Sequence, residues 1–269
     1  MTADARRYGE LVERHGLSLS HRTCLAWVPP ESRVLELGCS TGFIGAALIR
    51  DKGCTVDGIE VDPAAADIAR ERGLDVTVGS LESAALLDRV GRDYDIVLAT
   101  DVLEHLRAPE EILARVPQWL SSAGRFIAAV PNVAVWSMRM RLFRGDFTYE
   151  ETGLLDRTHL RFYTWHTFQA LLEEFGYSVE ERVVDTWEIP GLQTAWDGAH
   201  ARLARLDRDL GRSRVDRAVN RFVRRRLRVF VEGHQRWGAR LGRVAPNLAA
   251  THMTVRLQPP ATTSAPSSR

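Results

Sequence analysis

The sequence predicts an α/β fold in which a parallel sheet is doubly wound by helices. Short apolar runs that fit buried strands alternate with helical patterns from residue 33 to residue 130, and such alternation is typical of right-handed strand-helix-strand units. The first apolar run ends in an acid and small residues before a helix, which is the pattern of a ligand-binding turn. A hydrophobic content of 45% over 269 residues is enough to build one full core.

The elements are expected in chain order as follows. Residues 4–28 fit one or two amphipathic helices that are closed by Pro29 and Pro30. Their expected apolar side comprises Tyr8, Leu11, Val12, Leu19 and Leu25. Strands are expected near 33–37, 55–60, 75–78, 95–100 and 125–130, with helices near 42–51, 63–72, 82–90 and 109–120. Thr164 is the expected N-cap of a helix to about Phe175, before a strand at 177–186 and a last strand at 251–257.

The turn after the first strand follows the pattern Glu36-x-Gly38-x-x-x-Gly42. This differs from the Gly-x-Gly-x-x-Gly pattern of dinucleotide-binding turns. A second acid, Glu60, ends the next apolar run 18 positions after Gly42, about the offset at which a carboxylate meets ribose hydroxyls. The turn and the second acid therefore indicate a nucleotide cofactor.

Together with Gly58-Ile59-Glu60-Val61-Asp62, this turn resembles that of the class I S-adenosylmethionine (SAM)-dependent methyltransferases. The resemblance implies a Rossmann-like, seven-stranded sheet with an antiparallel last strand pair, and SAM as the cofactor. Glu36 would complement the positive charge of SAM, and Ser40, where many members have glycine, is expected to need a negative φ. The expected cofactor contacts are Glu36, Gly38, Cys39, Ser40, Gly42, Phe43, Glu60, Val61, Ser80, Leu81, Thr100 and Asp101.

The segment after the fourth strand, Thr100-Asp101-Val102-Leu103-Glu104-His105, resembles the Asp-x-x-Glu-His segment of the branch that includes ubiquinone-biosynthesis O-methyltransferases. A hydroxyl acceptor needs a base unless its own pKa is low. An imidazole with an ordinary pKa of about 6.5 suits that role, so His105 is a candidate catalytic base. The alternative is a histidine that only orients the loop.

A second polar segment contains the pattern Asp-x-Thr-His-x-Arg-Phe at residues 156–162. It resembles a recurrent segment of bacterial methyltransferases of polysaccharide, glycolipid or secondary-metabolite pathways. His159 is the alternative base, and the competing interpretation is a structural latch between Asp156 and Arg161. No metal is assigned: a divalent ion stays open as an alternative, since Asp101, Glu150, Glu151 and Asp156 could converge, but nothing in their spacing requires one. The candidate acceptor-binding residues are Asn132, Trp136, Arg157, Arg161 and Tyr163.

These motifs predict a methyltransferase that moves the SAM methyl group to a small-molecule, sugar or lipid-linked acceptor, at a hydroxyl, by in-line displacement with a histidine base. C- or N-methylation of a secondary metabolite is the nearest alternative. Two alternatives belong to other classes: a non-catalytic SAM-binding or scaffold protein, and an NAD-type oxidoreductase.

The expected domain scheme has five parts: helical cover at 1–30, SAM-binding core at 31–186, an Arg-rich helical insertion at 187–250, the last strand at 251–258 and a disordered tail at 259–269. The insertion carries fourteen arginines between Arg202 and Arg243 and an apolar helical face, which predicts a lid or a homodimer interface. Peripheral membrane contact is the first alternative to that interpretation. The insertion lacks interleaved stacking aromatics, which disfavours nucleic acid.

The net charge, the cysteines and the length of the apolar stretches indicate which binding partners and which cellular compartment to expect. The net charge of +1 gives no global case for nucleic-acid binding. Three cysteines, Cys24, Cys39 and Cys54, lack disulfide or metal spacing. No apolar stretch reaches membrane-spanning length, and the N-terminal residues lack a signal-peptide core. The expected location is the reducing cytoplasm.

Overall fold

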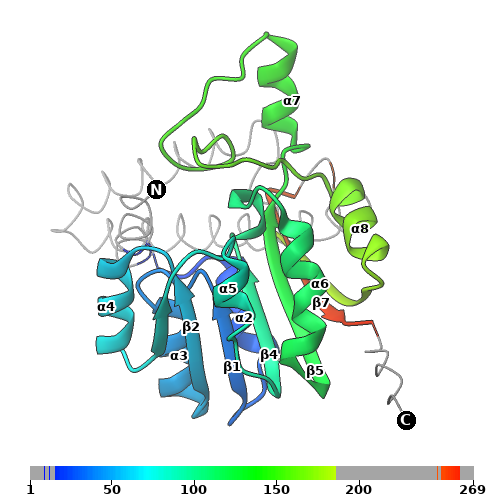
Figure 1. Cartoon of the computed structure of the whole chain (residues 1–269). Coiled ribbons are helices and arrows are strands. Elements are labelled where there is room, and N and C mark those ends of the chain that lie inside the picture. The colour runs from blue at the N-terminus through cyan, green and yellow to red at the C-terminus, as the bar shows by residue number, and fades with distance from the viewer. Residues whose placement is uncertain (1–8, 10–11, 13–15, 186–246, 248–249, 261–269) are drawn as a thin grey trace, which may run out of the picture. The chain divides into compact units, whose positions relative to one another are not determined.

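The computed structural model of the chain describes residues 9, 12, 16–185, 247 and 250–260. Its elements alternate between strand and helix through the first half of the chain (Figure 1). In chain order they are α2 (Leu19–Trp27), β1 (Arg33–Leu37), α3 (Phe43–Lys52), β2 (Thr55–Glu60), α4 (Pro63–Glu71), β3 (Asp75–Val78), α5 (Ala84–Leu87), β4 (Tyr94–Thr100), the 3₁₀ turn η1 (Leu103–His105), α6 (Pro109–Trp119), β5 (Leu120–Pro131), α7 (Trp136–Phe143), α8 (Trp165–Glu174), β6 (Ser178–Asp185) and β7 (His252–Gln258).

The strands of the described residues form one seven-stranded sheet in the order β3-β2-β1-β4-β5-β7-β6. Strands β1 to β5 pair in parallel, whereas β7 is antiparallel to β5. This topology confirms the predicted Rossmann-like α/β fold with its reversed strand near the end. From β1 to β3 each new strand is added on one side of the sheet, and from β4 onward on the other side of β1, so the strand order reverses between β1 and β4. Ligands of such sheets bind beyond the carboxyl ends of the strands at that point.

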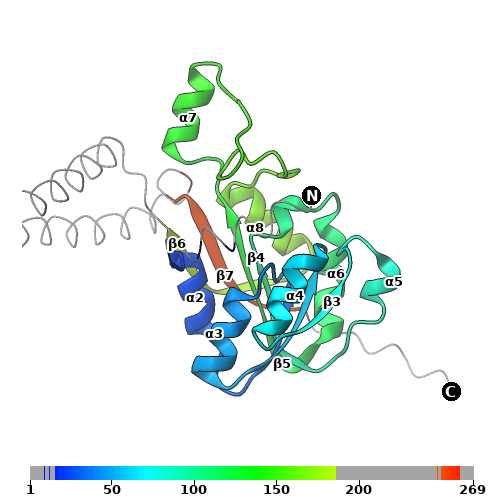
Figure 2. The ribbon, with the colours of Figure 1, turned by 90° about the vertical axis from the view of Figure 1, so that its left-hand side faces the viewer.

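Helices cover both faces of the sheet (Figures 1 and 2). One face packs on α2, α3 and α4 through a buried apolar cluster that includes Cys24, Leu48 and Ala69. The other face packs on α5, α6 and α8 through a second cluster that includes Ile112 and Phe168. Successive strand residues point to opposite faces, so a sheet that is buried on both faces needs the continuous apolar runs seen in the sequence.

Helix α2 corrects one expectation from the sequence. Its buried residues are Ser20, Thr23 and Cys24, whereas the predicted apolar positions Leu19 and Leu25 are only half-buried. The helix contacts α3, β4 and β7, and small side chains at such a contact allow the backbone to approach closely. Tyr8 and Leu11 lie outside the described residues.

Two other elements differ from the expected bounds. The helix expected at 82–90 is a single turn, α5, and β5 begins at Leu120, five residues before the expected start. Pro117 lies in the last turn of α6, where it removes one backbone donor, and the chain becomes extended from Leu120 onward. Thr164 caps α8 through a capping box, as predicted.

The described chain divides into two compact units. The first contains the sheet residues and the candidate site, and the second includes Val133–Phe147 and Val184–Thr251. The expectations for the insertion at 187–250 fall outside the described residues apart from positions 247 and 250, as does almost all of the tail at 259–269. No helix of the described residues is long and apolar enough to cross a membrane.

Candidate active site

The candidate site lies where β1, β2 and β4 end. Glu36 is the penultimate residue of β1, Glu60 ends β2 and Thr100 ends β4. Because these strands are parallel, their carboxyl ends meet at one edge of the sheet. This is the edge at which doubly wound sheets bind their ligands.

The turn between β1 and α3 is fastened to β2 by the main chain. The N–H groups of Gly38 and Cys39 both donate to the carbonyl of Ile59, with N···O distances of 2.8 and 3.1 Å. At the other end of the turn, the N–H of Gly42 donates to the carbonyl of Cys39 at 2.8 Å. The backbone of the turn is therefore held against the next strand before any ligand arrives.

Both predicted glycines of the turn are required by conformation and by packing. Gly38 and Gly42 have φ of +63° and +74°, a region that glycine occupies without strain. A Cβ at Gly38 would lie 2.8 Å from Val102 Cγ2, and one at Gly42 would lie 2.8 Å from Ala69 Cβ. The contact with Val102 also places the turn beside the segment that follows β4.

Ser40 is a correction, because a negative φ was expected there. Its φ is +51°, in the left-handed region where residues other than glycine are uncommon. The Ser40 N–H donates to Glu60 Oε2 at 2.8 Å, and the Asp62 N–H donates to Glu60 Oε1 at 2.8 Å. These hydrogen bonds to a buried carboxylate offset the backbone strain. Glu60 thus holds the turn in addition to its predicted role toward ribose hydroxyls.

Glu36 is a buried acid with an unsatisfied oxygen. Burial raises the pKa of its carboxyl group to about 8, although a hydrogen bond from the Gly45 N–H acts in the opposite direction. Its Oε2 has no hydrogen-bond partner among the described residues. A Cβ at Gly45 would lie 2.8 Å from that oxygen. A carboxyl group in this state fits a ligand that brings positive charge, because a nearby cation favours its ionised form.

The other predicted cofactor residues of the first two strand ends lie around the turn. Cys39 is buried, and burial raises the pKa of its thiol. The ring of Phe43, at the start of α3, lies 5.1 Å from that of His21 between centroids. Val61 is 40% exposed directly after β2, so it is free to contact a ligand at this edge.

Beyond β3, the side chain of Ser80 takes part in a local turn, because its Oγ accepts a hydrogen bond from the Glu82 N–H at 3.1 Å. Leu81 is partly buried against the core. After β4, Thr100 Oγ1 lies 3.5 Å from the thiol of Cys24. Each of these residues therefore stands at a strand end, but their predicted contacts with a cofactor stay predictions.

Asp101 has a strained backbone and lies beside a histidine. Its φ is +55°, and its N–H donates to the carbonyl of Ala129 at 3.0 Å. Its Oδ1 lies 3.6 Å from Nε2 of His252, the first residue of β7. Non-glycine residues with positive φ concentrate at functional sites. His252 was not predicted as a site residue, and only the sheet topology brings it to Asp101.

A chain of hydrogen bonds orients the His105 ring. Thr158 Oγ1 donates to Asp156 Oδ1 at 2.7 Å and lies 3.0 Å from His105 Nδ1. Since the single hydroxyl proton of Thr158 goes to Asp156, the Thr158 oxygen accepts from Nδ1–H. A neutral His105 therefore carries its lone pair on Nε2.

A main-chain carbonyl orients the His159 ring and selects the same tautomer as in His105. Its Nδ1 lies 3.2 Å from the carbonyl of Leu154, which can only accept, so Nδ1 bears the proton and Nε2 the lone pair. Burial lowers the pKa of His159, and the neighbouring His105 lowers it further. The two ring centroids are 4.8 Å apart in an edge-to-face arrangement. The two alternative bases are thus neighbours.

Glu104 connects the two segments that carry these histidines. Its carbonyl accepts from the N–H groups of Leu160 and Arg161 at 2.8 and 3.0 Å. Its side chain is fully buried, and neither carboxylate oxygen has a hydrogen-bond partner among the described residues. Burial raises the pKa of this carboxyl group well above its usual range, and the charge of Asp101 adds to the effect.

Sequence reasoning did not assign a role to Glu104, Gly45 or Thr158. Glu104 stands inside the Asp-x-x-Glu-His segment, so the motif itself could have drawn attention to it. Gly45 and Thr158 act through contacts with residues distant in the chain, on Glu36 and His105 respectively. No local pattern distinguishes such residues from an ordinary helix glycine or loop threonine.

Two of the predicted acceptor-binding residues are buried together. Asn132 and Tyr163 form an isolated parallel bridge between the end of β5 and the segment before α8. The Tyr163 hydroxyl has no hydrogen-bond partner among the described residues, and burial raises its pKa. A buried polar atom in this state is available to a ligand.

The other three predicted acceptor-binding residues are Arg157, Arg161 and Trp136. Arg157 pairs with Glu151 at 3.3 Å, and both side chains are exposed. Arg161 donates to the carbonyl of Arg107, two residues after η1. Together with the hydrogen bonds to the Glu104 carbonyl, this bond holds the segment before α8 against the segment that contains η1. Trp136 begins α7, in the second unit, and is 39% exposed.

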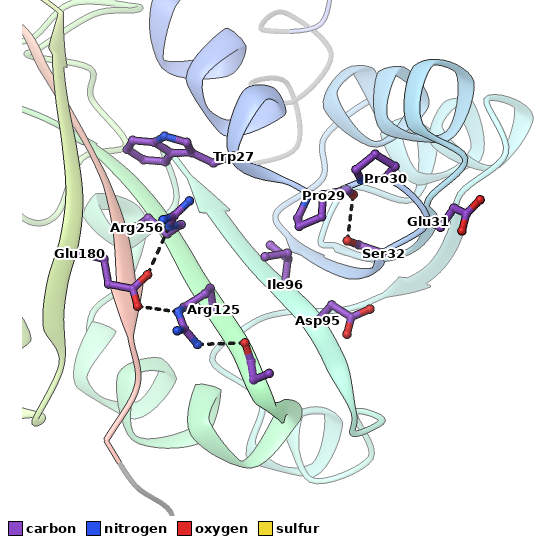
Figure 3. Close-up of a pocket in the computed structure, with 11 residues that line it drawn as sticks. Trp27, Pro29, Pro30, Glu31, Ser32, Asp95, Ile96, Arg125, Glu180 and Arg256 are labelled. Carbon is purple, nitrogen blue, oxygen red and sulfur yellow. Dashed lines mark hydrogen bonds and ion pairs between the residues drawn. The ribbon is translucent and has the colours of Figure 1, made fainter.

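An open groove of the first unit lies elsewhere and is not the site (Figure 3). It is lined by residues at the amino ends of β1 and β4, among them Ser32 and Asp95. Glu180 in this groove is paired with Arg125 at 2.8 Å and with Arg256 at 3.2 Å. These three charged side chains therefore pair with one another, and the groove is at the strand ends opposite to those that bind ligands in this fold.

Comparison with known proteins agrees with this geometry. A family model described as a methyltransferase domain matches residues 6–182. A ubiquinone biosynthesis O-methyltransferase of Ruegeria sp. is 27% identical over 154 residues, which cover 56% of this chain and 62% of the relative. One of Pseudomonas entomophila is 26% identical over 104 residues, which cover 37% of this chain and 44% of the relative. The chain thus spans about half the length of the curated relatives it matches.

A solved structure extends the agreement in fold to most of the chain. A SAM dependent methyltransferase from Archaeoglobus fulgidus superposes with a TM-score of 0.54 at 15% sequence identity. The superposition covers 93% of this chain and 98% of that one. At this level of identity the likeness concerns the fold.

Proposed function

The chain belongs to the methyltransferase domain family, and on that premise we propose that it methylates a hydroxyl group of a small-molecule acceptor. The family match, with the fold, confirms the predicted class I SAM-dependent methyltransferase and SAM as its cofactor. It also removes the NAD-type oxidoreductase from the alternatives. The acceptor atom, the base and the acceptor itself belong to the proposal.

The turn at residues 38–42, with Glu36 and Glu60, would hold SAM. When bound, SAM supplies a methyl group on a positively charged sulfur that leaves as a neutral thioether. The turn brings its backbone close to the ligand, because Gly38 and Gly42 carry no side chain. Glu36 offers a buried carboxyl group whose ionised form a cation stabilises.

The observation that carries the proposal is the pair of imidazole rings whose Nε2 atoms bear lone pairs. Hydrogen bonds at Nδ1 fix that tautomer in His105 and in His159. Either Nε2 can accept the proton that the hydroxyl loses as its oxygen bonds to the methyl carbon. Val102, three residues before His105, meets Gly38 of the cofactor turn, which supports a short distance between base and cofactor.

The relatives from Ruegeria sp. and Pseudomonas entomophila support oxygen as the acceptor atom, since both are named O-methyltransferases. N- or C-methylation is the alternative within the same class. A SAM-binding protein without catalysis remains the alternative of another class, and the same assay separates all three. Contact with membranes and dimerisation through residues 187–250 also stay predictions.

The proposal is tested by incubating the chain with SAM and separate sets of phenols, sugars, alcohols and primary amines. We expect S-adenosylhomocysteine to form with hydroxyl acceptors and mass spectrometry to locate the new methyl group on oxygen. Products that carry methyl only on nitrogen or carbon would contradict the hydroxyl assignment. Saturable SAM binding without turnover on any acceptor would favour the non-catalytic alternative.

Gly38→Ala is expected to weaken SAM binding by about tenfold or more. Gly53→Ala serves as its matched control, because the two glycines have nearly equal φ of +63° and +67° and so share the strain of a left-handed alanine. They differ in surroundings: the new Cβ meets Val102 at 2.8 Å in the first case, but its nearest neighbour is Glu31 Cγ at 4.0 Å in the second.

Calorimetric titration of both variants with SAM, with melting temperatures measured in parallel, checks this expectation. The expected outcome is a loss of melting temperature in both variants, larger in Gly38→Ala because of the contact with Val102, and a loss of SAM affinity in Gly38→Ala alone. An equal loss of affinity in the two variants would mean that the turn at Gly38 does not contact SAM.

A further inference from the structure

Glu104, His105 and His159, here called the Glu-His-His cluster, bring three metal-binding groups together from two segments of the chain. One carboxylate oxygen and one nitrogen of each imidazole all lie within 4.8 Å of one another. Glu104 and His105 belong to η1, after β4, whereas His159 belongs to the loop before α8. The hydrogen bonds from Leu160 and Arg161 to the Glu104 carbonyl hold the two segments side by side.

The cluster contains hydrogen-bond acceptors without a matching donor. The Nδ1 atoms of both rings are already engaged, by Thr158 and by the Leu154 carbonyl, so each ring is left with the lone pair of Nε2. Both oxygens of the Glu104 carboxylate lack a partner among the described residues, although the side chain is fully buried. A buried carboxylate without a donor is costly unless a cation or a proton pairs with it, and the two imidazoles lie within 4.8 Å of this one.

The surroundings of the rings have the form that metal sites use. A histidine that binds a metal through one nitrogen usually donates its other N–H to a carbonyl or carboxylate group, directly or through a polar side chain. His159 donates to the Leu154 carbonyl, and His105 donates to Thr158, which passes a hydrogen bond on to Asp156. Both rings are therefore fixed before an ion arrives.

We propose that the Glu-His-His cluster binds a divalent transition-metal ion. Two imidazole nitrogens and one carboxylate suit Mn²⁺, Fe²⁺, Co²⁺ or Zn²⁺, whereas Mg²⁺ and Ca²⁺ prefer oxygen ligands. An ion about 2.1 Å from each ligand atom draws those atoms to within about 3.4 Å of one another. The spread of 4.8 Å closes to that value by small side-chain rotations.

The position of the cluster gives the ion a role that rests on the proposed hydroxyl methylation. Glu104 and His159 are buried but His105 is half-buried, so the coordination sphere has an open side, as catalytic metal sites require. A hydroxyl bound there loses its proton to water more readily, because the ion stabilises the oxyanion. That oxyanion then forms the bond to the methyl carbon while the carbon-sulfur bond breaks. In this arrangement the two histidines are ligands and neither is the base.

The site is tested with the full chain, free of affinity tag and stripped of metal by a chelator, titrated with Co²⁺ and observed by visible absorption. One equivalent is expected to give the absorption bands of a nitrogen- and oxygen-bound Co²⁺ ion. Glu104→Gln keeps the shape of the side chain and removes its charge, and it should weaken Co²⁺ binding at least tenfold, as should His159→Ala. His166→Ala, an exposed histidine on α8, should bind Co²⁺ as the wild type does.

Thermal melting with and without Co²⁺ accompanies each titration, because an ion that binds only the folded chain raises its melting temperature. The rise is expected in wild type and His166→Ala and should be absent in Glu104→Gln. Co²⁺ binding that is unchanged in Glu104→Gln and His159→Ala overturns the site, as does a folded wild type that binds neither Co²⁺, Mn²⁺ nor Zn²⁺. If the folded wild type binds none of these ions, a proton shared within the Glu-His-His cluster takes the place of the metal.

SAM titration of the same samples separates this inference from the proposed function. A variant that loses Co²⁺ binding but keeps normal SAM binding and turnover leaves the site in place and overturns the role of the ion in methyl transfer. A chain that binds one Co²⁺ through the cluster but forms no methylated product supports the site and contradicts the proposed hydroxyl methylation.

Discussion

His105→Ala is expected to lower kcat for methyl transfer by about 10² to 10⁴, the usual contribution of a positioned acid-base group, with little change in SAM affinity. The ring is half-buried and carries its Nε2 lone pair because Thr158 and Asp156 fix Nδ1–H. Its removal takes away the group that activates the acceptor hydroxyl, whether as a base or as a metal ligand. The cofactor turn is not changed by this substitution.

Steady-state kinetics and SAM calorimetry on His105→Ala, His159→Ala and the exposed control His166→Ala check this expectation. A kcat loss confined to His159→Ala would give the role to that ring. Comparable losses in both fit the metal site. Normal turnover in both variants would contradict histidine activation altogether.

Thr158 provides a finer test within the same experiment, because it acts on the reaction only through His105. Thr158→Val removes the hydroxyl at 3.0 Å and leaves Nδ1–H only the Thr158 carbonyl at 3.3 Å. It should lower kcat more than it changes KM, whereas Thr158→Ser keeps the hydroxyl and should restore turnover. If Thr158→Ser is as slow as Thr158→Val, the hydroxyl does not position the ring.

Glu36→Gln is expected to stabilise the chain without SAM at pH 8.5, on the order of 4 kcal/mol in the free energy of unfolding, but not at pH 4.5. Burial raises the pKa of Glu36 to about 8 in the folded state, from its ordinary value of 4.5 in the unfolded chain. The folded state thus binds this proton more tightly than the unfolded state does. The stability that this provides is complete below pH 4.5 and is lost as pH rises through about 8.

Urea unfolding of wild type and Glu36→Gln at several pH values between 4.5 and 9 measures the difference. Glu71→Gln, which changes an exposed acid on α4, should follow the wild-type pH dependence. The same Glu36→Gln variant should bind SAM more weakly, since it lacks the charge that complements the cofactor. Parallel stability curves for wild type and Glu36→Gln across this range would show that Glu36 is not held neutral by burial.

These opposite effects on stability and on SAM binding follow from one feature. A buried acid with an unpaired oxygen is a cost to the empty protein and a contact for a cationic ligand. Functional sites commonly carry such a cost. Glu104 is likewise a buried acid, and both of its carboxylate oxygens are unpaired among the described residues. The proposed metal ion would be the cation that pairs with it.

The sequence by itself determined the order and type of the elements. The bounds of β1, β2 and β3 agree with the expected strands at 33–37, 55–60 and 75–78. It also determined the position of the glycine turn between Glu36 and Gly42, which is the predicted cofactor turn. These features depend on residues close together in the chain, through the period of apolar residues, the need for glycine in a tight turn, and capping at Thr164.

Only the tertiary structure decided how the site is assembled. Ser40 takes a positive φ because a carboxylate from the next strand, Glu60, binds its N–H. His105 and His159 were expected as alternatives, yet they are neighbours around Glu104, although 54 residues separate them in the chain. The tautomer of each ring follows from hydrogen bonds to Thr158 and Leu154. The contacts of Glu60 with Ser40 and of Thr158 with His105 arise from packing between segments that are distant in the chain, and no local pattern of residues encodes them.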